Sequence, residues 1–549
     1  MRRDYVCGLC VLWAVLPLAA QPVIRAQAGV VNAGSYSSPG LPNSGIAQGS
    51  IFVVIGKNLG PASIVSASFP LSTVLAGTSA QVTINGATVA PLLFYTSATQ
   101  VALLMPSSTP IGTGTITVTY GGQTSSAAAV QVVAASFGIF TLNQGGTGPA
   151  VVTDANYGVI TLTHAASPGQ VLVLWGTGLG KISADETQAP PQGNVGAQPT
   201  VWVGSQQASV FYWGRAGCCA GLDQINFQVP AGITGCYVPV AVQTGGTVSN
   251  FGSISVAGSS ACSDPVGLGS AQLSQVQNGQ NVSVEILSLS RSIVAMNPGS
   301  SGTAATTTDS GSASFLRYTP SQLLASSFGQ AVSAGYCTVF PTYGSGTVTD
   351  PVQPLGLDAG GVEVGGSNGT KNLTPVAGSK GYYSSTLGNS YLDPAAGPHT
   401  FNVLGGADVG PTSVAQDIQS PPVLAWSNQA AISTVSESQG VTVNWTNAAQ
   451  GGYVRVTGYS LSLDQSGNLA AGAAFFCTAD PGQGGTGQFT VPPPVLLSLP
   501  VSPASSSAPS GFLGVGSQTA RLPLPVPRGL DVGFVQTWVQ LMRSVTYAP

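Results

Sequence analysis

Two histidines limit the acid–base chemistry that this 549-residue sequence can support. A serine hydrolase needs an imidazole beside its nucleophile, so only His164 and His399 could serve. Residues 365–369 match the Gly-x-Ser-x-Gly nucleophile elbow. About one such match is expected by chance in a chain this rich in glycine and serine, and the match lacks the strand-turn-helix context of that chemistry. We therefore interpret both histidines and Ser367 as loop or turn residues and predict no catalytic residue.

Carboxylates around His399 offer another route to hydrolysis, because a suitably spaced pair of acids can cleave a glycosidic bond. Their neighbours favour a structural role, since Asp350-Pro351 and Asp393-Pro394 are typical starts of turns. An exported hydrolase that acts on polysaccharide is therefore the alternative hypothesis. The distances in space among the following residues test it: Asp350, Asp358, Glu363, Asp393, Asp408 and His399.

Cysteines are the next group with reactive side chains. An even number in an exported chain favours disulfides. Six remain beyond the N-terminal segment: Cys218, Cys219, Cys236, Cys262, Cys337 and Cys477. Because adjacent cysteines rarely bridge each other, we predict that the first two pair separately with the next two. The last two then pair by elimination. Four thiolates could instead bind zinc, but the paired Cys-x-x-Cys spacing of zinc sites is missing, so we predict no metal and no cofactor.

Aromatic side chains are the best candidates for binding. Successive strand residues point to opposite faces, so at least one ring of Phe211, Tyr212 and Trp213 faces outward. Exposed rings stack on sugars or on partner proteins. The competing interpretation places Trp202 and one ring of this run in the core and packs another ring under the Cys218-Cys219 loop. The candidate binding residues are Trp202, Tyr212 and Trp213.

The N-terminus reads as an export signal. Arg2 and Arg3 precede an apolar stretch from Val6 to Ala20, and cleavage after Ala20 or after Ala28 would follow. This stretch of about 15 residues is shorter than a membrane span, and no later segment is long enough, so we predict no span in the mature chain. A net charge of −4 without a basic stripe argues against nucleic acid as a partner.

The elements that must position these residues are β-strands. Only 6% of residues are charged and 43% are apolar, with 73 glycines and 39 prolines. This balance is typical of short strands joined by tight turns. Gly49–Gly60 recurs 120 residues later as Gly169–Gly180, and Gln100–Pro106 recurs as Gln224–Pro230. Two copies of one domain are therefore present, each a sheet-on-sheet sandwich of about 105 to 125 residues.

The recurring pieces resemble a known module. The Gly-x-x-Val/Leu-x-Val/Leu-x-Gly-x-x-Leu-Gly opening, the Gln-Ile-x-Phe-x-Val-Pro strand and the closing Gly-Gly-x-x-Ser hairpin are similar to the IPT/TIG immunoglobulin-like module over residues 30–257. Residues 217–227, Gly-Cys-Cys-Ala-Gly-Leu-Asp-Gln-Ile-Asn-Phe, resemble a stretch in a family of exported acidobacterial proteins of unassigned function. The resemblance implies a fold and an exported setting. It implies no catalytic residue.

The fold class predicted is all-β, with tandem immunoglobulin-like β-sandwiches followed by one or two further β-rich domains. The small-residue tract from Thr303 to Ser314 is predicted to be a loop. A disulfide between Cys337 and Cys477 would tie the last two segments together. The predicted units are an export signal (1–28), two TIG-like sandwiches (29–134 and 135–262), a β-rich region with a short helix at Ala271–Val276 (263–410) and a C-terminal β-rich domain (411–549).

The function predicted is that of a secreted, non-enzymatic β-sandwich protein with a structural or adhesive role at or outside the cell surface. Its expected partner is an extracellular glycan or a surface protein. The exported hydrolase, with TIG-like modules as accessory domains, is the alternative.

Overall fold

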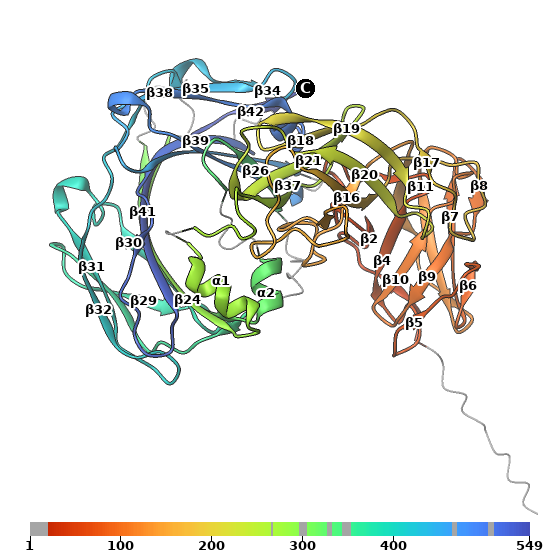
Figure 1. The fold of residues 1–549 in the computed structure, drawn as a ribbon, viewed down its shortest axis with the longest axis horizontal. Coiled ribbons are helices and arrows are strands. Elements are labelled where there is room, and N and C mark those ends of the chain that lie inside the picture. The colour runs from red at the N-terminus through yellow and green to blue at the C-terminus, as the bar shows by residue number, and fades with distance from the viewer. Residues whose placement is uncertain are drawn as a thin grey trace, which may run out of the picture.

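The computed structural model describes residues 20–264, 267–295, 305–326, 332–342, 353–463, 469–502 and 510–549. Nearly all regular elements in these ranges are β-strands, which confirms the all-β fold class (Figure 1). None of the helices described is long and apolar enough to cross a membrane. Most of the predicted export signal, residues 1–19, lies outside the described residues.

The first module is a sandwich of two sheets. One sheet contains β1 (Val23–Ile24), β2 (Val30–Asn32), β4 (Ile51–Lys57), β5 (Val65–Ser66), β9 (Leu92–Thr96) and β10 (Gln100–Leu104). The other contains β3 (Ile46–Ala47), β6 (Val74–Leu75), β7 (Thr78–Ile84), β8 (Ala87–Val89), β11 (Gly112–Tyr120), β12 (Gln123–Thr124) and β13 (Ala128–Val133). Every second residue of β7 is buried, including Val82 and Ile84, so the alternation in the sequence becomes the core.

The folded unit begins before residue 28, where the sequence placed the end of the export signal. Strand β1 pairs antiparallel with β4, with Val23 opposite Lys57 and Ile24 opposite Gly56. Ala28 is buried as well. Cleavage after Ala28 would remove β1 from the first sheet, whereas cleavage after Ala20 would leave β1 in place. The export signal and its cleavage site stay a prediction.

The second module folds a single ten-stranded sheet onto itself. Its strands are β14 (Gly138–Ile139), β15 (Val152–Thr153), β16 (Val171–Thr177), β17 (Gly193–Asn194), β18 (Thr200–Val203), β19 (Gln206–Arg215), β20 (Asp223–Gln228), β21 (Gly235–Thr244), β22 (Thr247–Val248) and β23 (Gly252–Val256). Long β19 pairs with β20 at one end and with β18 at the other, so it belongs to both halves. Leu172 and Phe227 from one half meet Val201 and Val240 from the other in the core.

The repeat in the sequence is a repeat in the structure. In the first module β4 pairs antiparallel with β10, and Ile55 lies opposite Gln100. In the second module β16 pairs antiparallel with β20, and Trp175 lies opposite Gln224. The same pieces of sequence therefore occupy the same places in the two sheets. Ile55 and Trp175 therefore occupy equivalent positions in the two modules.

The remaining chain forms one 14-stranded sheet with two small sheets beside it. The large sheet contains β24 (Val282–Ala295), β25 (Thr306–Tyr318), β26 (Cys337–Thr342), β27 (Leu355–Gly356), β28 (Val362–Gly365), β29 (Lys371–Pro375), β30 (Tyr382–Gly388), β31 (His399–Val403), β32 (Thr412–Ile418), β36 (Tyr453–Leu463), β37 (Leu469–Ala479), β39 (Gly511–Gln518), β40 (Leu522–Pro523) and β41 (Val532–Ser544). The small sheets contain β33 (Ala425–Trp426), β35 (Val441–Thr446) and β38 (Gly487–Val491), and β34 (Thr434–Ser436) with β42 (Thr546–Ala548).

In the described residues, three short α-helices accompany these sheets: α1 (Ser270–Gln277), α2 (Pro320–Ala325) and α3 (Pro493–Leu496). Helix α1 confirms the predicted short helix. Figure 1 shows α1 and α2 inside the curve of the large sheet, and their buried residues Leu273, Val276 and Leu323 pack with Val284 and Phe534 of that sheet. Three 3-10 turns complete the elements: η1 (Pro394–Ala396), η2 (Gln429–Ala431) and η3 (Gln483–Gly485).

The large sheet crosses the boundary that the sequence placed at residue 411. Its central strands β24 and β41 run parallel, with Val284 opposite Val532, and they come from the two sides of this boundary. A disulfide joins Cys337 on β26 to Cys477 on β37, which confirms that predicted pair. The segments 263–410 and 411–549 therefore share one sheet and a covalent link.

One predicted loop is a strand. Residues 306–314 belong to β25, which pairs with β24 along its whole length and with β30 at its middle. The small residues suit this central position, because Gly311 brings the backbone within reach of the Leu373 side chain. The small residues of this tract predicted a loop. Amino-acid composition alone does not show that β24 and β30 pair with the segment.

Candidate functional site

The serine and histidine that could form a hydrolase site do not bond to each other. Ser367 lies in the turn between β28 and β29, so a strand rather than a helix follows it, and its hydroxyl donates a hydrogen bond to the Ala396 carbonyl. His399 lies on β31, is buried beside Gly366 and stacks on Tyr391 with 5.4 Å between ring centroids. Within the ranges described, neither ring nitrogen of His399 has a hydrogen-bond partner. Burial lowers the pKa of this imidazole.

The acids of this region hold turns and caps. Asp358 accepts a hydrogen bond from the Gly360 N–H at 2.9 Å. Asp408 accepts one from the Asp358 N–H at 2.8 Å and one from Lys380 at 2.9 Å. These contacts lower the pKa of the Asp408 carboxyl, the backbone N–H most of all.

The remaining acids of this region are Asp393, Glu363 and Asp350. Asp393 caps η1 through the Ala395 N–H at 3.0 Å, and Glu363 lies on β28 opposite Asn402. Asp350 lies outside the described residues. The described acids of this set therefore lie in turns, in a helix cap or in a strand pair.

The predicted pairing of the clustered cysteines is wrong. Cys236 bonds to Cys262 instead, because β21 and β23 are neighbouring strands and bring these two together, with Cα atoms 5.3 Å apart. Cys218 and Cys219 lie on the loop between β19 and β20 and are free thiols. Across the described ranges, no three His, Cys, Asp or Glu side chains gather closely enough to hold a metal ion.

The three aromatic residues predicted to bind a partner are held by contacts within the second module. Trp202 donates from Nε1 to Gln243 at 3.4 Å, Trp213 donates to the Gly196 carbonyl at 3.4 Å, and the Tyr212 hydroxyl donates to the Arg215 carbonyl at 2.5 Å. The outward ring of the run is Phe211, which is 58% exposed. A register shift in the pairing of β19 with β20 falls at this residue and turns its side chain to solvent. A binding role for Trp202, Tyr212 and Trp213 stays a prediction.

A larger aromatic cavity lies where the two modules meet, and we call it the junction pocket. Its volume is about 820 Å³. Both modules contribute aromatic side chains: Tyr36, Phe94, Tyr95, Phe140, Tyr157 and Trp175. Cys218 and Leu222 complete it from the loop between β19 and β20. Cavities of this size with mostly apolar walls are typical of ligand sites.

Local turns place the aromatic side chains of this pocket. The Asn32 side chain accepts hydrogen bonds from the N–H groups of Gly34 and Ser35, and the turn presents Tyr36. Asp154 accepts hydrogen bonds from the N–H groups of Asn156 and Gly158 and holds Tyr157 outward, with 74% of its surface exposed.

His164 supports the Tyr157 turn. Its Nε2 lies 3.0 Å from Asp154, and this hydrogen bond is the main cause of the lowered pKa of the Asp154 carboxyl. Trp175 is fixed in the pocket wall because its Nε1 donates to the Thr153 hydroxyl at 3.0 Å. Two aromatic rings of the pocket are therefore positioned by hydrogen bonds from the second module.

Strained backbone gathers at the junction pocket. Tyr36, Gln144 and Tyr157 line it, and they have φ angles of 51°, 56° and 63°. Positive φ is unfavourable for residues with a side chain, and for bulky residues it is rare. Such strain concentrates at functional sites, where the surrounding structure maintains it.

Tyr36 and Tyr95 of the pocket stay protonated at physiological pH. Burial, together with the nearby Tyr36, raises the pKa of Tyr95 to about 12. Burial also raises the pKa of Tyr36. Both hydroxyl groups can therefore donate hydrogen bonds to a ligand, while their rings offer apolar faces.

A buried ion pair locks the two modules around this pocket. Arg215 and Asp223 contact each other with side chains that are 1% and 0% exposed. Arg215 also donates to the Gly49 carbonyl of the first module at 2.9 Å and to the Gly180 carbonyl at 2.7 Å. Gly49 has a φ of +69°, and a Cβ there would lie 2.5 Å from the guanidinium, so this position requires glycine.

Further bonds fix the ion pair and the interface. Within the second module, Asp223 accepts hydrogen bonds from the N–H groups of Gly178 and Leu179, at 2.7 and 2.8 Å. Burial raises the pKa of Asp223, while the guanidinium and these two donors act in the opposite direction. The Asn32 amide donates to the Thr177 carbonyl at 3.3 Å. The pocket is thus formed between two bodies held in one fixed orientation.

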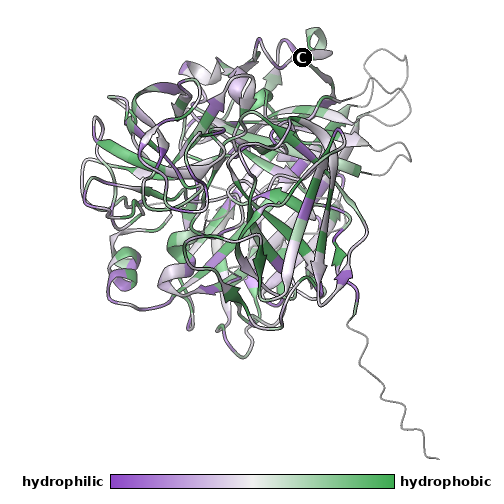
Figure 2. Cartoon of the chain, turned by 90° about the vertical axis from the view of Figure 1, so that its right-hand side faces the viewer, coloured by the Kyte–Doolittle hydropathy of each residue, from purple (hydrophilic) through white to green (hydrophobic). Residues whose placement is uncertain are grey.

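Figure 2 faces the side of the molecule that holds the two modules. Green, hydrophobic colour dominates many of their strands, as expected for strands that bury one side in a sandwich core. The apolar side chains of the junction pocket belong to this system of strands and to the loops beside it. β9 and β16 contribute Phe94, Tyr95 and Trp175.

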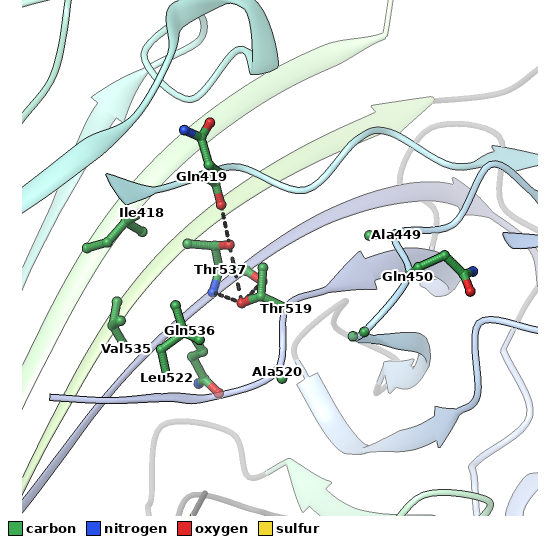
Figure 3. Close-up of a pocket in the computed structure, with 12 residues that line it drawn as sticks. Ile418, Gln419, Ala449, Gln450, Thr519, Ala520, Leu522, Val535, Gln536 and Thr537 are labelled. Atoms are coloured by element: carbon green, nitrogen blue, oxygen red, sulfur yellow. Dashed lines mark hydrogen bonds between the residues drawn. The ribbon is translucent and has the colours of Figure 1, made fainter. Parts of the chain in front are cut away.

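Two other cavities are weaker candidates for a ligand site. The one in Figure 3 has a volume of about 220 Å³ and lies beside β41 and β40. Its polar groups already bond to each other, since Thr537 donates to the Gln419 carbonyl at 2.8 Å and its N–H donates to the Thr519 hydroxyl at 3.0 Å. A third cavity, of about 500 Å³, includes Arg455, whose guanidinium already stacks on Phe476 at 4.7 Å.

The aromatic residues of the junction pocket were missed by sequence reasoning. One signal was present: Trp175 replaces Ile55 at the equivalent position of the repeat, and a large aromatic residue where the other copy has an aliphatic one marks a difference between the modules. The remaining rings come from separate turns and strands. Only the packing of one module on the other brings them together.

No protein-family profile matches the sequence, and no curated protein sequence is similar to it. Among solved structures, similarities include an Escherichia coli adhesin, FdeC, at 15% identity with a TM-score of 0.14, covering 72% of this chain and 98% of that one. Another is the Bacteroides ovatus protein SGBP-B in complex with a mixed-linkage heptasaccharide, at 11% identity with a TM-score of 0.14, covering 84% of this chain and 87% of that one.

A third is the gamma-CGTase of Alkalophilic bacillus clarkii, at 12% identity with a TM-score of 0.15, covering 49% of this chain. This chain spans 34% of the length of that enzyme. The sheets of the structure define the class of protein. It is an all-β chain with tandem immunoglobulin-like sandwiches at its N-terminal end.

Proposed function

We propose that this chain is an exported, non-enzymatic binding protein whose junction pocket holds an extracellular glycan. The observation that carries the proposal is the convergence of six aromatic side chains from two modules on one cavity of about 820 Å³. The apolar faces of sugar rings stack on aromatic side chains, and hydroxyl groups of sugars bond to phenols and amides.

The rigidity of the junction supports this role. A site formed by two mobile bodies must be ordered when the ligand binds, and that ordering weakens affinity. Here Arg215 and Asn32 hold the modules together before any ligand arrives. Tyr36 of the first module and Trp175 of the second are then presented at a constant separation, which suits recognition of successive rings of a chain.

Two disulfides support export, because such bonds persist in oxidising surroundings. The turn and cap roles of Asp358, Asp393 and Asp408 support a function without catalysis. The alternative, an exported hydrolase, would need either two suitably spaced acids or a serine beside an imidazole. Ser367 bonds to a backbone carbonyl instead of to His399.

A glycan array probed with the full mature chain tests the proposal. Tyr157→Ala is the main variant, because this side chain is 74% exposed and its loss leaves the core intact. We expect its affinity for the bound glycan to fall by about tenfold, the value of one stacked ring. Phe211→Ala is the matched control, since this ring is 58% exposed but lies outside the pocket.

Two results would overturn the proposal. If Trp213→Ala or Trp202→Ala abolished binding while Tyr157→Ala did not, the ligand surface would be the face of β18 and β19. If the chain bound no glycan on the array, carbohydrate would be excluded as the ligand of the junction pocket. In that case a protein partner would be the next candidate.

A further inference from the structure

Two adjacent thiols lie at the edge of the junction pocket. The Sγ atoms of Cys218 and Cys219 are 2.6 Å apart. Thiols that merely touch stay farther apart than this, and a covalent bond between two sulfurs measures about 2.05 Å. Cys218 lines the pocket and is exposed, and Cys219 is partly buried.

The loop that carries these cysteines is held by contacts that do not involve sulfur. The flanking residues Arg215 and Asp223 form the buried ion pair. The Ala216 N–H donates to the Leu222 carbonyl at 3.0 Å, which closes the loop at its base. Gly221 has a φ of +66°, and a Cβ there would lie 2.5 Å from Leu104 of the first module. The backbone therefore fixes the Cα and Cβ atoms of both cysteines, and the distance between their sulfurs follows from the side-chain rotamers.

The other cysteines of the mature chain are already used. Cys236 bonds to Cys262, and Cys337 bonds to Cys477. In the part of the chain that the structure describes, each thiol of the loop consequently has the other as its available partner. The same oxidising surroundings that form the two disulfides act on this pair.

We propose that Cys218 and Cys219 form a disulfide with each other at the rim of the junction pocket, and that this bond is reversible. Neighbouring Cα atoms are about 3.8 Å apart, below the usual separation of roughly 4.4–6.8 Å across a disulfide, so the eight-membered ring that the bond closes is strained. Strained and exposed disulfides are reduced more easily than relaxed ones. The rim of the pocket therefore exists in two covalent states.

The reaction is thiol–disulfide exchange with an oxidised partner of the disulfide class, either a small-molecule disulfide or a dithiol oxidase. The Cys218 thiolate attacks one sulfur of this oxidant, forms a mixed disulfide and releases one thiolate. Cys219 then loses its proton and attacks Cys218, which releases the second thiolate. Two protein thiols are oxidised, and one disulfide is reduced to two thiols. Burial raises the pKa of Cys219 to about 11, so exposed Cys218 is the first to react.

Peptide mass mapping of the full mature chain tests the bond. The chain is incubated with oxidised glutathione, denatured with iodoacetamide and digested without reductant. We expect the peptide that contains both cysteines to carry no alkyl group and to lack two hydrogens. The Cys236–Cys262 bond is the internal control for complete oxidation. Alkylated Cys218 and Cys219 in a sample where that control is intact would overturn the proposal, as would a cross-link to any other cysteine.

Reversibility is measured by titrating the oxidised chain with dithiothreitol. We expect the loop disulfide to open at a dithiothreitol concentration roughly tenfold lower than the Cys236–Cys262 bond requires. Simultaneous opening of the two bonds would contradict a redox role. The Cys218→Ser/Cys219→Ser variant confirms the assignment, because it must lose only the first transition.

The bond does not depend on the proposed ligand, whereas its effect on binding rests on the proposed function. Glycan affinity of the oxidised and the selectively reduced chain is therefore measured as a separate experiment, with the double serine variant as the control that does not respond to reductant. If no glycan binds but the bond forms, the proposed function fails and the disulfide stands. If glycans bind and the two cysteines stay reduced, the opposite is true.

Discussion

The module pair and the large sheet bury charged groups in different ways. In the module pair, Arg215 and Asp223 contact each other and bond to backbone groups of both modules. The large sheet has a comparable pair, Arg291 with Asp309, but it also buries Glu285 completely. Neither carboxylate oxygen of Glu285 has a hydrogen-bond partner among the described residues. His399 is buried in the same region without a partner in those ranges.

This difference separates a region whose geometry is fixed from one whose stability responds to pH. A buried ion pair that bonds to several backbone groups specifies one arrangement, which is what a pocket between two modules requires, even though Nε of Arg215 has no partner in the described ranges. A buried carboxyl without a partner favours its neutral form, so the folded state gains or loses stability as protons are exchanged. Variants of the module pair and of the large sheet test this contrast.

Removing the Cys337–Cys477 bond should have the largest effect. The bond closes a loop of 140 residues, whereas Cys236–Cys262 closes one of 26. In the chain-entropy description, these losses cost about 5 and about 3.5 kcal/mol respectively. Guanidinium unfolding of the Cys337→Ala/Cys477→Ala and Cys236→Ala/Cys262→Ala variants measures both. Equal losses would show that loop length does not set the contribution of either bond.

Breaking the ion pair at the junction should cost nearly as much. Arg215→Met leaves the Asp223 carboxylate buried without its cation, and we expect a loss of about 3–5 kcal/mol of stability. Arg25→Met is the control, because that guanidinium bonds only to the carbonyls of Gln27 and Ala28 near the surface. Chemical unfolding gives the free energies. A loss below about 1 kcal/mol for Arg215→Met would remove the ion pair as the lock between the modules.

Glu285→Gln should stabilise the large sheet at neutral and alkaline pH. Burial raises the pKa of Glu285 from 4.5 to about 7 in the folded chain. The folded state therefore binds the proton of Glu285 more tightly than the unfolded state does. The free energy of unfolding is highest below pH 4.5 and falls as the pH rises through 7. The substitution should recover about 3 kcal/mol above pH 7 and remove this slope.

The free energy of unfolding between pH 4 and pH 8 measures the effect of this substitution. Glu363→Gln, on β28 of the same sheet, is the matched control and should keep the slope. If Glu285→Gln destabilised the protein at every pH, the carboxylate would be paired in solution.

Replacement of His399 should have the smallest effect and the opposite dependence on pH. Burial lowers the pKa of His399 from 6.5, so the folded state disfavours the charged imidazole. The stability that depends on the neutral imidazole is therefore present above pH 6.5. It is lost as the pH falls through the pKa that His399 has in the folded state. His399→Phe keeps the ring that stacks on Tyr391, and we expect stability at pH 7 to change by less than about 1 kcal/mol.

The acid side of the stability profile is the informative readout for this variant. His399→Phe should flatten the part of the slope below pH 6.5. A steeper slope in the His399→Phe protein would mean that the imidazole is charged in the folded chain.

Much of the fold could be predicted, but little of the site. The composition and the recurrence of Gly49–Gly60 as Gly169–Gly180 indicated strands and a duplicated domain, and β4 and β16 confirm both. Sequence reasoning selected Trp202 and Trp213 for binding because they are conspicuous near one another in the chain. The rings that share a cavity, including Tyr36 and Trp175, are 139 positions apart.

By itself, the sequence determined which short segments become strands and which of their side chains face a core, because a period of two residues and the cost of exposing apolar groups act locally. Only the tertiary structure decided that Cys236 bonds to Cys262, that a tract of small residues becomes β25, and that aromatic side chains from two modules line one pocket. These outcomes depend on contacts between distant residues. The free energy of such a contact belongs to the pair and to its surroundings, so neither segment carries it alone.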